Sequence, residues 1–423
     1  MAWVMVGLPV ALLLLGFPIF LILLTTSAIV LIFFVDVPTT LIHQQMFASI
    51  DKFALLAVPF FIFAGDLMTR GGVSARLIDW VNSIIGGVRG SLPLTALGTA
   101  TIFGAISGST GATVAAVGTL TYRPLREAGY DARFASGMLT SAGAIANIIP
   151  PSIAMILYGF ATETSVVQLF AAGIVPGLVL AAAFGIYIYL YVGRTGVPVA
   201  GAVTWRGFTR ATARLGWALG APVIILGGIY AGVFSPTEAA GVACVYAILV
   251  TMAIYREIAP RELFRTAANS AFLTGQVFII VAAAGVYSWL LTVTGVATAA
   301  TDYIAGLGMP QWMLLLVLNL FMLFVGTVLD TASAILVLTP LLADIALAVG
   351  VHPVHFGIVA VVNLTIGTFT PPFGLNIFVG QAVFRVPLAT LYPGLLPFIA
   401  LAIAALMLIT NVPDLSLWIL EFI

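Results

Sequence analysis

Two segments of this chain carry the same interruption: residues 143–159 read GAIANIIPPSIAMILYG, and residues 364–380 read LTIGTFTPPFGLNIFVG. An offset of 221 residues, from Pro150 to Pro371, aligns the two proline pairs. Each copy follows a stretch rich in Gly, Ser, Thr or Asp inside apolar sequence, at 104–111 and at 326–333. Paired, interrupted hydrophobic segments in the two halves of a membrane protein are the sequence signature of a secondary transporter.

The composition places the chain in a lipid bilayer. It is 62% hydrophobic and 7% charged, against about 25% charged residues in soluble proteins. Runs of about 20 apolar residues, long enough to cross the hydrocarbon core, recur along the chain. We therefore expect an all-α polytopic membrane protein in which residues 1–423 form one integral membrane unit, with residues 2–35 making one long span or two short ones. The formal net charge is zero, so nothing indicates a nucleic-acid partner.

The arginines predict the orientation in the membrane. Lys52 is the only lysine, and the arginines fall at 70–89, 123–133, 194–214 and 256–265, with Arg385 alone. Threading the apolar segments alternately puts every arginine on one face, which the positive-inside rule makes cytoplasmic. The loop at 122–133 is then cytoplasmic, whereas the loop at 343–355, which has no Lys or Arg, is external. The two repeats therefore enter the membrane from opposite faces, as inverted repeats do.

This threading makes each Gly/Ser/Thr stretch the tip of a re-entrant helical hairpin. Residues 91–121 and 312–343 must each enter and leave on one face, with tips near 107–110 and 326–331. Each hairpin is followed by a helix that its proline pair breaks, which gives two units, 91–160 and 312–380. Non-helical backbone at that depth is tolerated only where protein or a water-filled cavity surrounds it.

The broken helices suggest a cation site. Proline lacks an N–H group and clashes with the carbonyl one turn back, so the carbonyls at 147–149 and 368–370 need other partners. A sodium ion is a candidate partner for these carbonyls, because it is a hard cation suited to carbonyl and hydroxyl oxygens. The hairpin tips add the hydroxyls of Ser107, Ser109, Thr110, Thr327 and Thr331. The alternative is that these small residues serve helix packing, as Gly, Ser and Thr commonly do in membranes.

Asp330 is the only acid that we expect deep in the membrane. An ionisable residue there is costly and is a functional-site hypothesis by default. It could bind substrate hydroxyls, assist cation binding or carry a proton; the alternative is a cap for the N–H groups at a hairpin tip.

The remaining polar motifs give weaker predictions. His43, His352 and His355 are expected in external loops, so no membrane-embedded histidine could serve a serine as its base, and an enzyme has no support. His352 and His355 are not expected to bind zinc. The arginine-bearing segments 203–214 and 259–268 are typical of amphipathic helices that lie on the cytoplasmic surface.

Four stretches then carry a family resemblance. They are FGAISGS at 103–109, NIIPPS at 147–152, GGIYAGVFSPTEAA at 227–240 and TPPFG at 370–374. Through them the chain resembles, along nearly its whole length, the large membrane subunit of TRAP (tripartite ATP-independent periplasmic) transporters. The string at 227–240 is the most specific of the four.

The resemblance implies a sodium-coupled importer of organic acids, often carboxylates, in the bacterial inner membrane, with no organic cofactor. It implies two partners, a small four-helix membrane subunit and a periplasmic substrate-binding protein. It also implies an elevator mechanism, in which the hairpins and broken helices move and residues 168–268 contribute to a fixed scaffold. The implied substrate-binding residues are Ser107, Ser109, Asn147, Asp330 and Thr331. The implied sodium-binding residues are Ser107, Gly108, Asn147, Pro150, Gly326, Thr327, Thr368, Thr370 and Pro371.

One alternative function keeps the same architecture. A proton-coupled or stand-alone carrier of organic anions would have the same inverted repeats, with Asp330 carrying the proton. A channel would tolerate such repeats without requiring them.

Overall fold

The computed structural model describes residues 2–35, 37–195 and 203–423, and these residues form helices and connections with no β-strand. Seven of the described helical segments are long and apolar enough to cross a membrane. The predicted all-α polytopic membrane protein is therefore confirmed. The N-terminal apolar run forms two helices, α1 (Ala2–Leu14) and α2 (Ile19–Phe34). They separate because Gly16 takes a left-handed conformation with φ +80° and Pro18 precedes α2.

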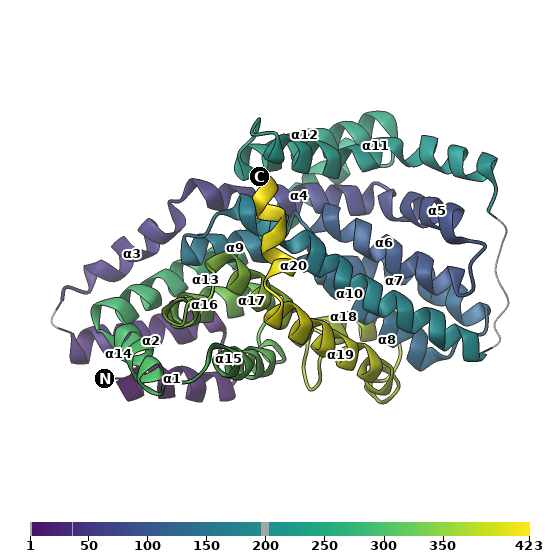
Figure 1. The fold of residues 1–423 in the computed structure, drawn as a ribbon. Coiled ribbons are helices and arrows are strands. Elements are labelled where there is room, and N and C mark those ends of the chain that lie inside the picture. The colour runs from purple at the N-terminus through teal and green to yellow at the C-terminus, as the bar shows by residue number, and fades with distance from the viewer. Residues whose placement is uncertain (1, 36, 196–202) are drawn as a thin grey trace.

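One set of helices, the peripheral group, packs together away from the proline pairs. Contacts join α12 to α4 and α11, and α13 to α2, α3 and α4. In Figure 1, α11 and α12 run along the upper edge and α3 lies at the left. Its members besides α2 are α3 (Thr40–Ile50), α4 (Ala57–Arg70), α11 (Trp205–Tyr230), α12 (Pro236–Ile248) and α13 (Pro260–Val293).

A second set, the central group, contains both proline pairs. Its first half consists of α6 (Ser91–Ser107), α7 (Thr110–Glu127), α8 (Ala132–Ala142), the 3-10 turn Gly143–Asn147 and α9 (Ile153–Thr162). Its second half consists of α15 (Gln311–Gly326), α16 (Thr331–Ala348), α17 (Pro353–Gly367) and α18 (Leu375–Phe384). Both Pro-Pro peptide bonds are cis. Each half thus contains a helix pair followed by a helix that ends at a proline pair and resumes beyond it.

The two halves exchange contacts. Helix α7 of the first half packs on α18 of the second, and α16 of the second packs on α9 of the first. A Cβ on Gly118 would lie 2.6 Å from the Phe384 ring, which also stacks on Tyr122 with centroids 4.8 Å apart. Because each hairpin rests on the broken helix of the other half, the central group is one packed body.

The resemblance assigned residues 168–268 to a scaffold, and the helices of this range pack on two different groups. Helix α10 (Val166–Thr195) packs on α17 of the central group and on α19 (Leu388–Asn411), a helix that packs on α8 of that group, rather than on α11 or α12. Its Phe184 meets Phe369 and Phe398 edge-on, with centroids 6.4 and 5.2 Å apart. By packing, α10 thus lies against the central group, while α11, α12 and the start of α13 lie in the peripheral group; the assignment of 168–268 to a scaffold stays a prediction. Residues 196–202 lie outside the described chain.

The two arginine-bearing segments are not separate surface helices. Residues 205–214 are the first turns of α11, and residues 260–268 are the first turns of α13. No proline or left-handed residue interrupts either helix where its charged part meets its apolar part, so each continues as a single rod. The predicted amphipathic helices are therefore the charged ends of long apolar helices.

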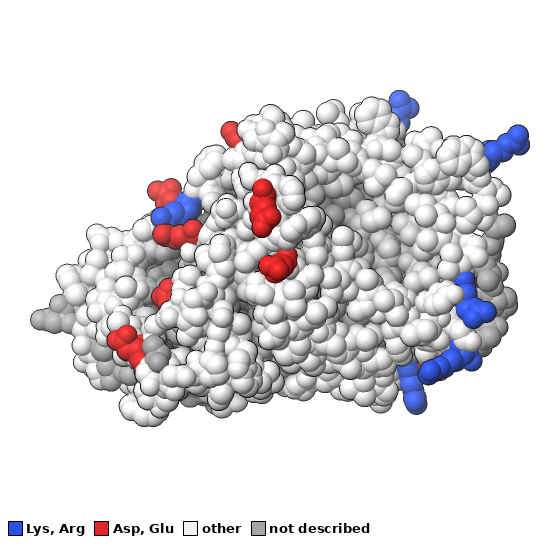
Figure 2. Space-filling model, viewed as in Figure 1, with Lys and Arg blue, Asp and Glu red and all other residues white. Residues whose placement is uncertain are grey.

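Helix α5 (Val73–Ile85) connects the two groups, because it packs on α6 of the central group and on α11 of the peripheral group. The remaining elements are α14 (Val296–Gly306), α20 (Asp414–Leu417), the short helices Phe53–Leu56 and Trp418–Phe422, and a π-helical turn at Leu249–Ile254. On the face shown in Figure 2, most of the Lys and Arg lie towards the right-hand end, whereas Asp and Glu lie towards the left and centre, with one basic side chain among the acidic ones at the upper left.

Candidate functional site

The tip of the first helix pair lies directly on the first break. Gly108 joins α6 to α7 with φ +59°, and a Cβ there would stand 3.0 Å from the carbonyl oxygen of Pro151. One turn earlier, a Cβ on Gly104 would lie 2.5 Å from the Cα of Ala146. Glycine is required at these positions because backbone approaches backbone.

The first break leaves a run of carbonyl oxygens without partners. Within the described chain, no hydrogen bond reaches the carbonyls of residues 148–151. The carbonyl of Asn147 differs, because it accepts a hydrogen bond from the Ser152 hydroxyl. The Ser152 oxygen in turn accepts from the N–H of Met155 and so caps α9. The prediction that the carbonyl of Asn147 is free is therefore wrong. The carbonyl of Pro150, a residue that the resemblance implies for sodium binding, is among those that no hydrogen bond in the described residues reaches.

The second break repeats this arrangement with different residues. A Cβ on Gly367 would lie 2.3 Å from the carbonyl carbon of Gly326, so α15 and α17 touch through two glycines. The Gly374 N–H donates to the carbonyl of Thr327 (2.9 Å), and the Asn376 N–H donates to that of Thr368 (2.8 Å). These two carbonyls are therefore occupied, whereas no hydrogen bond in the described residues reaches those of Thr370 and Pro371.

The threonine hydroxyls near the second break donate their protons to nearby backbone carbonyls. Thr327, Thr368 and Thr370 each donate their proton to a backbone carbonyl within four residues, at 2.7–2.8 Å. A hydroxyl oxygen that donates its proton in this way keeps lone pairs for another partner. Ser107 Oγ lies 3.0 Å from Thr113 Oγ1, and Thr113 donates to the Ser109 carbonyl at 2.9 Å.

Ser109 and Asp330 occupy equivalent places, as N-caps of the second helix in each pair. Ser109 Oγ accepts from Ala112 N (3.4 Å), and Asp330 accepts from Ser333 N (3.1 Å) and Ser333 Oγ (2.5 Å). The capping alternative for Asp330 therefore matches the geometry. A capping carboxylate with four lone-pair sites still has capacity for a further partner.

Many buried polar side chains have no partner among the described residues, and three side chains without a partner concern the candidate site. Asn147 is 8% exposed, and its amide forms no hydrogen bond. The Thr331 hydroxyl is buried and unbonded, and so are both amide atoms of Asn376, which is 0% exposed. An unpaired buried polar group costs about 1–3 kcal/mol, so each of these three needs an explanation.

Sequence reasoning missed Asn376. It lies in α18, two residues beyond Gly374, inside a decapeptide whose only other polar side chain is that of Gln381. That isolated polar residue directly after a helix break was the signal that could have identified it.

The histidines differ from their predicted place in loops. His43 lies within α3 and His352 is the N-cap of α17. His355 lies inside α17, 2% exposed, with Nδ1 2.6 Å from Ser416 Oγ and Nε2 3.3 Å from the Thr410 carbonyl. Its ring is therefore enclosed by a structural network, and the described residues contain no cluster of three metal-ligating side chains.

Two interrupted helices, each facing a helix pair in an all-α membrane body, define the class of multi-pass transport proteins. Residues 6–415 match the family described as "Tripartite ATP-independent periplasmic transporter, DctM component". The chain belongs to this family, and it is thus a large permease subunit of the bacterial inner membrane rather than an enzyme.

Several characterised relatives cover most of the chain. It is 39% identical over 373 residues, 88% of this chain and 87% of the relative, to a C4-dicarboxylate TRAP transporter large permease of Pseudomonas aeruginosa. It is 38% identical to the ectoine/5-hydroxyectoine large permease of Ruegeria pomeroyi, over 97% of this chain and 96% of that one. It is also 38% identical to an isethionate TRAP permease of Oleidesulfovibrio alaskensis, over 90% of this chain and 60% of that protein.

A solved structure supports the fold. The YdaH transporter of Alcanivorax borkumensis superposes with a TM-score of 0.67 over 98% of this chain and 99% of that one, at 13% sequence identity. At that identity the likeness concerns the fold alone.

Proposed function

We propose that this protein is the large permease of a sodium-coupled TRAP symporter that imports a small organic anion, a carboxylate in particular. The observation that supports it best is the pair of helix breaks, each with unbonded carbonyl oxygens beside a glycine-rich hairpin tip. Such oxygens in hydrocarbon cost several kcal/mol unless they find a partner. A cation between tip and break would supply one at both places.

The donor sets fit sodium chemically, because they contain only neutral, hard oxygens. At the first break these are the carbonyls of residues 148–151 with Ser107 and Gly108 of the tip. At the second they are the carbonyls of Thr370 and Pro371 with the hydroxyls of Thr327 and Thr368. Hard cations prefer carbonyl and hydroxyl oxygen over nitrogen or sulfur.

The substrate would lie between the two breaks. Asn147, Thr331 and Asn376 have amide and hydroxyl groups that lack partners, and amide N–H and hydroxyl groups donate to carboxylates. The N-terminal ends of α7, α9, α16 and α18 add partial positive charge there. The relatives named for C4-dicarboxylates and isethionate support an anion, and those named for ectoine show that the family varies its substrate.

An elevator movement would take place along the seam between the two groups. At this seam a Cβ on Gly65 of α4 would lie 3.0 Å from the Cα of Ser107, at the tip of the first helix pair. Backbone packed this closely, without long side chains between, can slide as a rigid surface. A periplasmic binding protein would deliver the substrate, and a small membrane subunit would brace the peripheral group.

Uptake into proteoliposomes tests the coupling. The protein would be reconstituted with its small subunit and binding protein, and labelled substrate would be followed at fixed pH under an inward sodium gradient. We expect accumulation against the substrate gradient that stops when sodium is replaced by potassium. Accumulation driven equally by a proton gradient without sodium would support the proton-coupled alternative instead, and Asp330→Asn would then abolish it.

A further inference from the structure

A cavity of about 250 Å³ opens between α5 and the first turns of α11, outside the helix breaks. Its walls contain Arg76, Asp79 and Ser83 from α5 and Arg210 and Arg214 from α11. Small residues make the space, since Gly86 on α5 and Gly207 and Ala211 on α11 also line it. The volume is below the about 300–1,000 Å³ of pockets for drug-sized ligands, so it suits a compact group.

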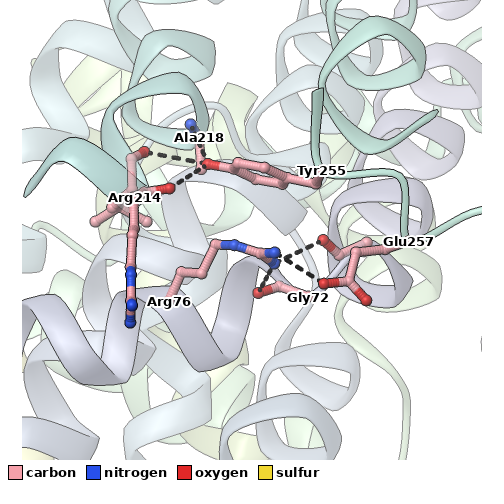
Figure 3. A network of polar contacts seen from close by, with 8 residues as sticks. Gly72, Arg76, Arg214, Ala218, Tyr255 and Glu257 are labelled. Atoms are coloured by element: carbon pink, nitrogen blue, oxygen red, sulfur yellow. Dashed lines mark hydrogen bonds and ion pairs between the residues drawn. The ribbon is translucent and has the colours of Figure 1, made fainter. Parts of the chain in front are cut away.

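The charges in this cavity are not balanced. Arg76 donates to Glu257 (2.8 Å) and to the Gly72 carbonyl (2.9 Å), and it lies over the Tyr255 ring at 4.0 Å. Figure 3 shows the hydrogen bonds of Arg76, and in it no dashed line reaches the Arg214 guanidinium.

The other charged groups of the cavity form no ion pair within the described chain. These groups are Arg210, Arg214 and Asp79. Residues 196–202, which lie outside it, contain no Asp or Glu. Two free arginines against one free aspartate leave one net positive charge in the cavity.

The pattern of side chains along α11 indicates that the cavity lies at the level of the lipid headgroups. Arg206, Arg210 and Arg214 occupy the first turns of α11, and the helix then exposes Trp217 and Val223, 55% and 69% accessible. A charged helix end followed by an exposed tryptophan and exposed aliphatic residues is typical of a membrane interface. A ligand held by the two arginines could therefore extend apolar chains along the exposed side of α11.

We propose that this cavity binds a phosphate group, carried by a membrane phospholipid, between Arg210 and Arg214. Arg210 and Arg214 are one turn apart and share a face of α11, and guanidinium groups match phosphate oxygens in charge and geometry. A phosphodiester carries a single negative charge, which equals the net charge of the cavity.

Lipid titration of the delipidated, detergent-purified full chain tests this proposal. Phosphatidylglycerol binding would be followed by native mass spectrometry and by the thermal unfolding midpoint, for the wild type and for Arg210→Gln/Arg214→Gln. We expect the double variant to bind at least about tenfold more weakly, the factor for losing one charge-assisted hydrogen bond. Arg206→Gln is the matched control, because Arg206 lies on the same helix end but not in the cavity, and its affinity should stay within twofold.

Two further arms identify the source of the phosphate and guard against misfolding. If inorganic phosphate at millimolar concentration displaces the lipid and stabilises the protein with the same arginine dependence, the phosphate comes from the cytosol. If it does not, the lipid is the source. Arg214→Lys, which keeps the charge, should restore part of the affinity lost in Arg214→Gln. Equal lipid binding by the double variant and Arg206→Gln, with both proteins monodisperse, would overturn the proposal.

Discussion

Asn376 is the residue whose environment is most difficult to explain by packing alone. The oxygen and nitrogen of its side-chain amide are buried and unbonded. Its backbone N–H, in contrast, donates to the carbonyl of Thr368 at the break. The unpaired amide of Asn376 at this helix break can therefore bind a substrate or an ion.

Replacing Asn376 by leucine separates stability from transport. We expect Asn376→Leu to leave the thermal unfolding midpoint unchanged or higher, because removing an unpaired buried amide is neutral or stabilising. Uptake should fall about tenfold or more, as expected when one hydrogen bond to a charged substrate is lost. Asn411→Leu, at an exposed amide on α19, is the control. Normal uptake by Asn376→Leu would remove Asn376 from the site.

Gly367 tests the close contact between α15 and α17. Gly367→Ala should lower the free energy of unfolding by about 1–3 kcal/mol, the usual cost of overpacking, because the new Cβ would meet Gly326 backbone. Gly216→Ala in α11, where a Cβ would meet nothing within 4 Å, should be neutral or stabilising. Thermal unfolding of both variants in detergent measures this, and equal midpoints would contradict the contact.

At the scale of the element, the proline pairs determine where main-chain oxygens stay free. Pro150→Ala/Pro151→Ala supplies two N–H donors that can reach those oxygens. We expect the sodium concentration for half-maximal uptake to rise about tenfold or more, as for the loss of about 1.4 kcal/mol of ion binding. Pro222→Ala, inside α11 and away from both breaks, should leave it unchanged. An unaltered sodium response in the double variant would mean that the break is architectural only.

The elements also define what the sequence could and could not predict. Pro150-Pro151 and Pro371-Pro372 located both helix breaks, because a missing N–H acts on its own helix whatever surrounds it. The carbonyls of Asn147 and Thr368 were predicted free and are bonded, since their partners Ser152 and Asn376 depend on the path of the chain after the break. The burial of His355 likewise depends on α20, which is far away in sequence.

Long helices were harder to place than their breaks. The charged start of α11 resembled a surface helix because its local pattern is amphipathic, and only its continuation shows it to be one end of a rod. The resemblance assigned α10 to the same scaffold range as α11 and α12, whereas its Phe184 contacts lie in the central group. Apolar periodicity does not distinguish a lipid-facing surface from a protein-facing one, because both are apolar.

For the whole molecule, the orientation in the membrane makes a direct prediction. Cysteines introduced at Arg123 and at His352 should react with an impermeant maleimide from opposite sides, Arg123→Cys from the cytoplasm and His352→Cys from outside. The only native cysteine, Cys244, is buried, so the background should be low. Labelling of both from one side would rule out the inverted threading and the transport mechanism built on it.

The exchange of contacts between the two halves has a consequence for biogenesis. The Phe384 ring can pack on Gly118 of α7 only after the ribosome has completed α18. At about 5–20 residues per second, the intervening stretch takes on the order of ten seconds or more to translate. During that delay the first helix pair must stay in the membrane without its final neighbour, held by lipid or by an insertion chaperone. Nascent chains arrested before residue 375 should therefore be unusually sensitive to membrane proteases.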